Sequence, residues 1–559
     1  MTASAPDRRE RGGSGRAPAR QASGASHQSG WNFADVFEAL ADRQPDALAQ
    51  RSGGRSTTWA EFDRRADGVA AALLAAGVVE QDKVAQYLYN SPPYLESTLG
   101  AFKAGLATVN TNYRYTADEL THLWDNADVV AVVFDATFTR TVDELRARLP
   151  GIRTWLWVDD GSGPCPEWAV DYESAAAAPP ADRVVAPWGR SADHLLLLYT
   201  GGTTGTPKGV MWRQGDLFGA LDTANKKRLP PEQDLDAAAE RVVKPGPRNL
   251  PAAPLMHGTG LFNALSNLMV GGSVITMEGR RFDPVELLAT VQHERINSMS
   301  IVGDAFAKPI LRVLDADPRR WDISSLRVIV SSGVIWSAES KAGLLRHNDR
   351  LIMVDSLGSS EAIGMASSTV STQGAAATAS FQLGASTRVV AEDGRDVIPG
   401  SGQRGLVAMR GYTPIGYYKD PDKSAATFRV IEGQRYSIPG DFATVHADGT
   451  VRLLGRGSQC INTGGEKVYP EEVEEVLKLH PTVADAAVVG VPDERFGEAI
   501  TALVEPHAGD VVDEAVLIAH VKEHLAGYKA PKRVLRIESI GRAANGKLDY
   551  RALKAVATS

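Results

Sequence analysis

The sequence Tyr199-Thr-Gly-Gly-Thr-Thr-Gly-Thr-Pro-Lys208-Gly209 directly follows an apolar run, Leu195–Leu198, that is typical of a buried strand. Its glycines permit positive φ angles and a close approach of the backbone to a ligand. Threonine hydroxyls, backbone N–H groups and the Lys208 ammonium together suit a polyphosphate. The spacing differs from a Walker-type loop, because Pro207 separates the last threonine from Lys208. The alternative is a plain surface loop. Seven consecutive glycines or threonines after a strand argue against this alternative.

Further short apolar runs predict more strands, separated by segments of helix length. Thr58 and Glu61 predict a capping box, and Gly77 is expected to end the helix that follows it. Buried strands that alternate with helices favour an α/β architecture with mostly parallel sheets. The other predicted strands are Val84–Tyr89, Val129–Phe134, Ile152–Val158, Ser273–Met277, Arg327–Val330 and Leu351–Val354.

A second, smaller unit is predicted to begin shortly after Gly455. A chain of 559 residues is too long for one compact core. The late segment has the pattern of a small α+β domain, and a cleft between two domains is a common ligand site. We expect a disordered tail over 1–30, a large domain over 31–457 and a small lid domain over 458–559. The predicted elements of the lid are a helix after Pro470–Glu472, strands Val483–Val491 and Ile500–Val504, and a helix over Val516–Leu525.

Composition excludes several classes of protein. The net charge of −8 gives no overall signature of nucleic-acid binding. The longest apolar runs fall well short of 18 residues, so no transmembrane helix is expected. The two cysteines, Cys165 and Cys460, lie far apart and have no metal-ligand spacing, which favours a reducing, cytoplasmic compartment. The sequence does not decide the oligomeric state, and a homodimer is one expected assembly.

The loop at 199–209 resembles the phosphate-binding signature of the adenylate-forming superfamily, which includes acyl-CoA synthetases, luciferases and the adenylation domains of peptide synthetases. Six motifs occur in the order of that superfamily, from about Trp31 to the C-terminus. The resemblance implies a large N-terminal domain, with mostly parallel sheets flanked by helices and a distorted barrel, and a small mobile α+β C-terminal domain. It also implies ATP, Mg²⁺ and coenzyme A as the small molecules that bind, together with a carboxylic acid substrate.

The motifs also imply residues for ATP and for catalysis. Ser360 and Glu361 match the hydroxyl and the carboxylate of a motif that contacts phosphate and Mg²⁺, and Thr200 is expected to share the metal. Asp441 and Arg456 match the ribose-binding residues. Lys547, in Asn545-Gly-Lys, matches the catalytic lysine, so the expected catalytic set is Lys547, Glu361 and Thr200. The expected phosphate-binding residues are Thr200, Gly201, Gly202, Thr203, Thr204, Gly205, Thr206 and Lys208.

Other positions concern the acid and the thiol. The expected substrate-binding residues are His257, Gly333, Leu357, Gly358, Gly464 and Gly465. Leu357 replaces the aromatic residue that covers adenine in the superfamily, and Ser458 stands at the hinge position. Gly358 occupies the position where acetate-using members have tryptophan, which predicts a pocket open to medium-chain, long-chain or bulky acids. The 455–474 segment resembles synthetases that act on fatty acids or steroid side chains.

The resemblance predicts an ATP-dependent ligase that forms an acyl-adenylate and then an acyl-CoA thioester. We expect the 416–421 segment, Gly-Tyr-Tyr-Lys-Asp-Pro, to be scaffold. The alternatives are a stand-alone adenylating enzyme that loads a carrier protein and a luciferase-like oxygenase. A non-catalytic adenylate-binding regulator is a third alternative, disfavoured because Lys547 and Glu361 are both present.

Overall fold

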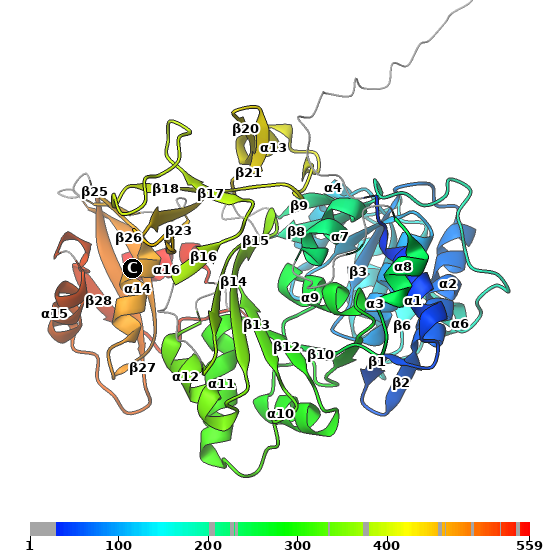
Figure 1. Cartoon of the computed structure of the whole chain (residues 1–559), viewed down its shortest axis with the longest axis horizontal. Helices are drawn as coiled ribbons and strands as arrows, with labels where there is room; N and C mark the ends of the chain where they lie inside the picture. Colours follow the sequence, from blue (N-terminus) through cyan, green and yellow to red (C-terminus); the bar gives the residue numbers. More distant parts are fainter. Residues whose placement is uncertain are drawn as a thin grey trace, which may run out of the picture.

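The structure is a computed structural model, and it describes residues 30–200, 207–223, 229, 233–333, 336–372, 380–456, 461–463, 466–493, 497–525, 527–543 and 548–559. The predicted tail lies outside these residues, except for Gly30. Figure 1 shows the large domain, coloured blue to yellow, beside the smaller orange and red C-terminal domain. Among the described helices, none combines the length and the apolar character that crossing a bilayer requires.

A mostly parallel sheet forms the N-terminal part of the large domain. Its strand order is β19-β9-β8-β4-β3-β5-β6-β7, with β9 and β19 antiparallel at one edge. Apolar side chains cover both faces, as expected for parallel strands. The strands are β3 (Lys83–Tyr87), β4 (Ala107–Asn110), β5 (Val129–Asp135), β6 (Thr154–Val158), β7 (Val170–Asp171), β8 (Leu195–Thr200), β9 (Lys208–Arg213) and β19 (Gly416–Tyr417). The helices before and along it are α1 (Phe33–Arg43), α2 (Trp59–Ala75), α3 (Pro92–Lys103), α4 (Ala117–Asn126), α5 (Thr139–Arg146), α6 (Tyr172–Ala176), α7 (Gln214–Asp222) and α8 (Leu235–Glu240).

A second sheet continues from parallel into antiparallel strands. The parallel part has the order β1-β11-β10-β12-β13-β14, and β2 pairs antiparallel with β1. Its strands are β1 (Leu48–Ser52), β2 (Arg55–Thr58), β10 (Arg248–Pro251), β11 (Ser273–Thr276), β12 (Ser298–Ile301), β13 (Val328–Ser332) and β14 (Ile352–Ser359). Its helices are α9 (Gly258–Leu268), α10 (Pro284–His293), α11 (Gly303–Ala316) and α12 (Ala338–His347).

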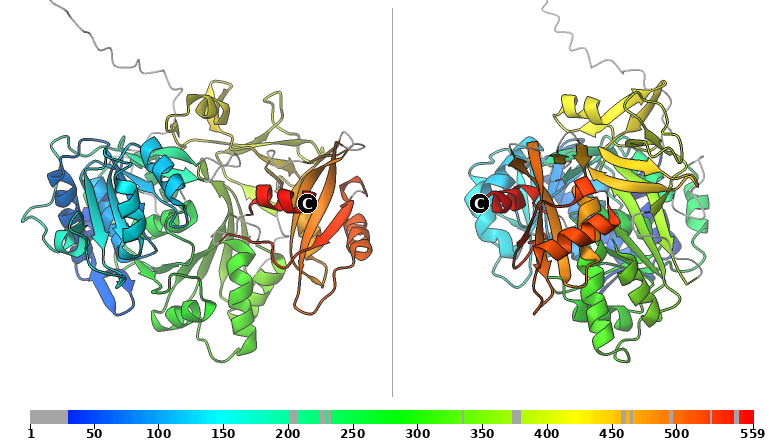
Figure 2. Two further views of the ribbon diagram at one scale, coloured as in Figure 1. Left: turned by 180° about the vertical axis from the view of Figure 1, so that it is seen from behind. Right: turned by 90° about the vertical axis from the view of Figure 1, so that its left-hand side faces the viewer.

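The antiparallel strands that follow β14 correspond to the predicted distorted barrel. They enclose an apolar core of their own, which includes Leu357, Met365, Phe381 and Val407. Figure 2 shows this layer between the first sheet and the C-terminal domain. Its elements are β15 (Ala362–Val370), β16 (Ser380–Leu383), β17 (Thr387–Val390), β18 (Arg404–Arg410), α13 (Pro421–Thr427), β20 (Phe428–Ile431), β21 (Gln434–Ser437), β22 (Asp441–Val445) and β23 (Val451–Arg456).

The C-terminal domain has the predicted α+β character. A sheet of order β25-β24-β27-β26, with β28 beside β27, packs against helices on both faces. Each of the predicted lid elements has a counterpart in the structure. The elements are β24 (Ile461–Thr463), β25 (Glu466–Val468), α14 (Pro470–Lys478), β26 (Val483–Asp493), β27 (Gly497–Pro506), α15 (Glu514–His524), β28 (Arg533–Arg536) and α16 (Tyr550–Thr558).

The predicted capping box at the start of α2 is confirmed in part. Thr58 accepts a hydrogen bond from the Glu61 N–H at 3.2 Å. Gly77 follows the helix with a φ of +74°, as a glycine after a helix end commonly does. The reciprocal pair of bonds forms instead at α4, where Thr116 and Glu119 bond to each other's backbone N–H groups. The sequence analysis did not identify this second box.

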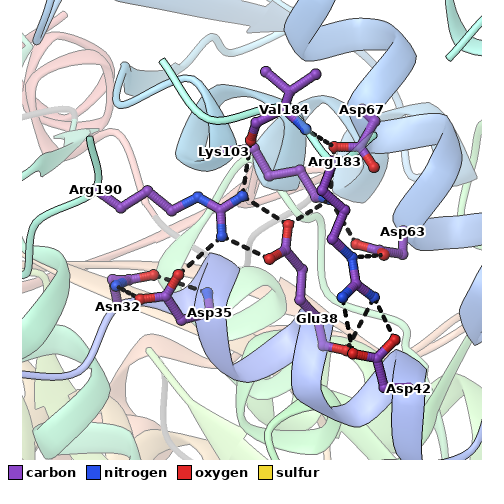
Figure 3. A network of polar contacts seen from close by, with 10 residues as sticks. All are labelled: Asn32, Asp35, Glu38, Asp42, Asp63, Asp67, Lys103, Arg183, Val184 and Arg190. Carbon is purple, nitrogen blue, oxygen red and sulfur yellow. Dashed lines mark hydrogen bonds and ion pairs between the residues drawn. The ribbon is translucent and has the colours of Figure 1, made fainter. Parts of the chain in front are cut away.

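A charged network buried beside the N-terminal sheet fixes α1, α2 and α3 to one another (Figure 3). The Lys103 side chain is fully buried, and its ammonium contacts Glu38, Asp63 and Asp67 within 2.8 Å. Because a buried charge is costly without partners, this set of carboxylates explains how a lysine can lie inside the domain. Arg183 and Arg190 complete the network through ion pairs to Asp42 and Glu38.

Candidate active site

The predicted phosphate loop joins two paired strands. Thr200 ends β8, Lys208 begins β9, and the two are cross-strand partners. The loop therefore leaves and re-enters the sheet at adjacent positions. A Cβ on Gly209 would lie 2.6 Å from the Tyr199 ring, so this position requires glycine. The loop residues Gly201, Gly202, Thr203, Thr204, Gly205 and Thr206 lie outside the described residues, and their roles stay predictions.

Asn110, which sequence reasoning missed, joins the start of the phosphate loop to the residue before His257, a predicted substrate-binding residue. Its side chain is buried at the end of β4, and it both donates to Tyr199 O at 2.9 Å and accepts from Tyr199 N at 2.6 Å. The same amide donates to Met256 O at 2.7 Å, next to His257. A polar side chain at the carboxyl end of an apolar strand is the sequence signal that could have identified it.

Glu361 lies where several motifs meet. Its Oε1 accepts a hydrogen bond from the Tyr417 hydroxyl at 2.8 Å, and its carbonyl oxygen accepts one from Ser437 at 2.6 Å. The Trp212 indole donates to Ser360 O at 2.9 Å. Trp212 and Tyr417 lie on β9 and β19, strands that pair with each other beside the phosphate loop. These contacts fix Glu361 relative to the loop that carries Lys208.

The 416–421 segment therefore does more than the expected scaffold role. Tyr417 orients the Glu361 carboxylate, and Tyr418 N donates to Gly209 O at 2.8 Å. Because β19 lies far from β9 in sequence, only the sheet order brings Tyr417 to this position. The expectation was incomplete, since it treated the segment as a structural support alone.

The strand before Ser360 and Glu361 is longer than predicted. The predicted strand ended at Val354, but β14 continues through Ser359 and turns directly into β15. Antiparallel pairing with β15, from Asp355↔Ser368 to Ser359↔Ala362, extends the strand, with an irregularity near Gly358. The 355–361 motif thus forms the end of a hairpin, and Glu361 lies in its turn.

The two predicted substrate positions in this hairpin differ in their surroundings. Leu357 is 9% exposed and packs into the apolar core of the antiparallel layer. Little of its side chain remains to contact a ligand. Gly358 is partly exposed, and a Cβ there would lie 3.2 Å from Ala362 O, which requires a small shift of the turn.

The predicted ribose residues lie side by side on paired strands. Asp441 begins β22 and is the cross-strand partner of Arg456 at the end of β23. The Asp441 side chain is mostly buried. Ser437, four residues before Asp441, contacts Glu361. The segment predicted to bind ribose is thereby linked to the segment predicted to bind the metal.

His257 lies directly before helix α9, and Gly333 lies directly after strand β13 of the second sheet. His257 occupies the position before α9, and its N–H donates to Pro254 O at 3.1 Å. Gly260 allows this tight turn, because a Cβ there would lie 2.3 Å from Pro254 O. Gly333 follows β13 with a φ of +99°, a conformation that favours glycine.

Lys208 forms an ion pair with Asp420, directly before α13. The hydrogen bond from the Lys208 ammonium holds the pKa of the Asp420 carboxyl below its usual value. The other carboxylate oxygen caps α13 by accepting from the Lys423 N–H at 2.9 Å. A phosphate bound by Lys208, as predicted, would compete with Asp420 for the same ammonium group.

Replacing Asp420 with asparagine is expected to lower the KM for ATP. Asparagine keeps the helix cap but removes the competing charge. Both side chains of the pair are about one quarter exposed, so the ion pair is weak and the expected decrease is about two- to fivefold. Initial rates over a range of ATP concentrations measure it, with Asp422→Asn at the neighbouring exposed carboxylate as the control. A higher KM would contradict the competition.

The structure describes residues of the small domain that come before and after the predicted catalytic lysine in the sequence. Lys547, Gly464 and Gly465 lie outside the described residues, as does the Arg456 side chain. Before the lysine, Arg542 forms an ion pair with Asp485, with a contact of 2.9 Å. After it, Tyr550 OH donates to Glu474 at 3.0 Å. Both contacts lie within the small domain, and Arg542 and Tyr550 flank Lys547 in the sequence.

Sequence comparison agrees with this arrangement. The profile of the AMP-binding enzyme family matches residues 37–418, and the profile of the AMP-binding enzyme C-terminal domain matches residues 472–547. The chain therefore belongs to the family of AMP-binding enzymes, whose adenylate-forming motifs the sequence carries. The predicted boundary between 457 and 458 falls between the two matches and stays a prediction.

The chain is similar to curated relatives over nearly its whole length. A medium/long-chain-fatty-acid–CoA/3-oxocholest-4-en-26-oate–CoA ligase from Mycolicibacterium smegmatis is 40% identical over 536 residues, covering 94% of this chain and 96% of the relative. A 3-oxocholest-4-en-26-oate–CoA ligase from Rhodococcus rhodochrous is 40% identical over 537 residues, covering 94% and 95%. A crystal structure of the anthranilate CoA ligase AuaEII with anthranoyl-AMP shares the fold, with a TM-score of 0.80, 22% identity and coverage of 94% and 97%.

Proposed function

We propose that this protein is an ATP-dependent acid–CoA ligase. It forms an acyl-adenylate from a carboxylic acid and ATP, with release of pyrophosphate, and then transfers the acyl group to coenzyme A. The observation that carries the proposal is the position of Glu361, which contacts Tyr417 beside the phosphate loop and Ser437 four residues before Asp441. The predicted phosphate, metal and ribose motifs thus converge on one place.

The chemistry explains why such a site is needed. A carboxylate is a poor electrophile, and its attack on the α-phosphate of ATP gives it a good leaving group. Charge develops on phosphate oxygens during this step, so positioning and electrostatic stabilisation supply most of the catalysis. In the proposal, the loop from Thr200 to Lys208 holds the β- and γ-phosphates, and Lys547 contacts the oxygens between the acid and the α-phosphate. Asp441 and Arg456 hold the ribose.

Glu361 and Thr200 are proposed to hold Mg²⁺. A carboxylate and a hydroxyl are hard oxygen donors, the kind of ligand that this ion prefers. The Tyr417 hydroxyl occupies one lone pair of Glu361 and fixes the direction of its carboxylate. When bound, Mg²⁺ supplies positive charge beside the triphosphate. Tyr417 and Trp212 keep Glu361 and Ser360 in place for it.

The two half-reactions are proposed to use one site in turn. Rotation of the small domain about Ser458 would remove Lys547 after adenylation. It would bring Gly464 and Gly465 toward the acyl carbonyl, where their small size leaves room for the pantetheine arm of coenzyme A. The ion pair between Arg542 and Asp485 supports this view, because it fixes the described residues just before the lysine to the small domain.

Medium-chain, long-chain or bulky acids, including steroid side chains, are proposed as substrates. Gly358 supports the open pocket, and the relatives from M. smegmatis and R. rhodochrous are named for such acids. A cytoplasmic location is part of the proposal and rests on the low number of cysteines, two that lie far apart in the sequence.

Replacing Gly358 with tryptophan is expected to shift the preference toward short acids. An indole at this partly exposed position near the end of β14 would fill the proposed acyl pocket. Pocket contacts of this kind change the ratio of kcat/KM between two substrates by about 10²-fold. The measurement is kcat/KM for propionate against dodecanoate. The control is Gly358→Ala, which tests the 3.2 Å approach to Ala362 O without filling the pocket. An unchanged ratio in the tryptophan variant would contradict the assignment.

A screen of pyrophosphate release over acids of graded size, with and without coenzyme A, tests the function. The proposal predicts release that depends on the acid and a thioester product that depends on coenzyme A. A parallel set of carrier proteins in place of coenzyme A tests the loading of a carrier. Turnover with a carrier and none with coenzyme A would refute the second half of the proposal.

A further inference from the structure

Helix α15 carries a group of metal-ligand side chains that the ligase reaction does not use. His520, Glu523 and His524 follow the spacing i, i+3 and i+4, which places them on one side of the helix. One ligand atom from each residue lies within 4.8 Å of those of the other two. Figures 1 and 2 place α15 at the outer end of the small domain, on the side away from the large domain.

Hydrogen bonds to the backbone set the orientation of both imidazole rings. His520 Nε2 lies 3.0 Å from Val476 O, and His524 Nδ1 lies 2.8 Å from His520 O. A carbonyl oxygen can only accept, so these two ring nitrogens carry the protons. In the neutral rings, the lone pairs are therefore on Nδ1 of His520 and Nε2 of His524. Metal-binding histidines have this arrangement, in which one nitrogen donates to a carbonyl and the other binds the ion.

His480 supports the group from the neighbouring helix end. Its ring packs edge-on against His520, with 5.1 Å between ring centroids. Its Nδ1 lies 2.9 Å from the Thr482 hydroxyl. The His520 ring is thus held between His480 and the carbonyl of Val476, which belongs to α14.

We propose that His520, Glu523 and His524 form a binding site for a divalent transition metal of the Zn²⁺ class. Two imidazole nitrogens and one carboxylate oxygen, with water as a fourth ligand, suit a tetrahedral zinc ion. Mg²⁺ prefers an octahedral set of oxygen ligands, so the site discriminates against the ion proposed for Glu361. His480 acts as a positioning residue.

The proposed ion would stabilise the small domain. His520 belongs to α15 and bonds to α14, and the two helices share an apolar core that contains Leu517, Val521 and Val473. An ion that holds the His520 ring therefore strengthens the contact between the helices. Binding to the folded state alone raises the unfolding temperature. The site is separate from the ligase chemistry, so its failure would leave the proposed function untouched.

Calorimetric titration of the full chain, without an affinity tag and in metal-free buffer, tests the site with ZnCl₂. One equivalent is expected to bind, with no competition from millimolar MgCl₂. His524→Ala removes one ligand from an exposed position on the helix and is expected to weaken binding by about tenfold or more. Glu523→Gln should weaken it as well. His446→Ala, at an exposed histidine of the large domain, is the matched control and should bind zinc as the unchanged chain does.

Thermal unfolding provides a second measurement. Zinc should raise the unfolding temperature of the small domain in the unchanged chain and in His446→Ala, but much less in His524→Ala. Acyl-CoA formation with Mg²⁺ should be the same in all of these variants. The absence of zinc binding, or equal affinity in His524→Ala and the control, would overturn the proposal.

Discussion

Replacing Lys547 with alanine is expected to lower acid-dependent pyrophosphate release by about 10²- to 10³-fold, the effect of losing one preorganised group that stabilises transition-state charge. Formation of the thioester from a supplied acyl-adenylate should be nearly unchanged. The difference arises because the ammonium group is needed only while charge develops at the α-phosphate. In the proposal, the second half-reaction uses Gly464 and Gly465 of the small domain in place of the lysine.

The structure gives this prediction its physical basis through the anchors around the lysine. Ile540 N donates to Glu505 at 2.8 Å, and Arg542 pairs with Asp485. Leu548 and Tyr550 pack against the sheet of the small domain on the other side. These contacts do not involve the Lys547 side chain, so its truncation should leave the domain folded.

Quenched assays of pyrophosphate release and of thioester formation measure the two effects separately. Lys554→Ala is the matched control, because this lysine lies on α16 of the same domain and pairs with Glu498 at 2.9 Å. It should retain both activities. An equal loss of both half-reactions in Lys547→Ala would count against the assignment of this lysine to the first step.

Replacing Glu361 with glutamine is expected to lower kcat/KM for ATP by about 10²- to 10³-fold. Glutamine keeps the size of the side chain and can still accept the hydrogen bond from Tyr417, so the turn should stay folded. It removes the negative charge of the carboxylate, which in the proposal binds Mg²⁺. The Mg²⁺ concentration needed for half-maximal rate should rise.

Tyr417→Phe separates charge from orientation. This variant keeps the Glu361 carboxylate and removes only the hydroxyl that donates to it at 2.8 Å. A loss of about tenfold is expected, the scale of removing an outer partner of a metal ligand. Titration of activity with MgCl₂ compares the two variants. An unchanged Mg²⁺ requirement in Glu361→Gln would refute the role of this carboxylate.

Local patterns in the sequence predicted most of the elements. The runs Val129–Phe134 and Leu195–Leu198 became β5 and β8, because β-branched and other apolar residues suit strands buried on both faces. The small domain followed its predicted order, from α14 to α15. The predicted end of β14 was wrong, because pairing with β15 extends the strand through Ser359.

Contacts between distant segments could not be predicted in this way. Trp212 meets Ser360, and Tyr417 meets Glu361, only because β9 and β19 pair at the edge of the first sheet, next to the hairpin of β14 and β15. Asn110 similarly depends on the neighbouring position of β4 and β8. Sheet order is a property of the whole chain. The sequence motifs therefore predicted the residues that bind or react with ATP, but not the residues that position them.

The central claim is that the site forms an acyl-adenylate before it transfers the acyl group to coenzyme A. The most direct test is to analyse the nucleotide products of one turnover without coenzyme A. Enzyme, ATP, Mg²⁺ and dodecanoate are mixed, quenched at intervals and separated by mass. The account predicts a burst of about one pyrophosphate per active site, with bound acyl-AMP that becomes acyl-CoA and free AMP when coenzyme A is added. Formation of ADP and phosphate, or pyrophosphate release that does not depend on the acid, would contradict it.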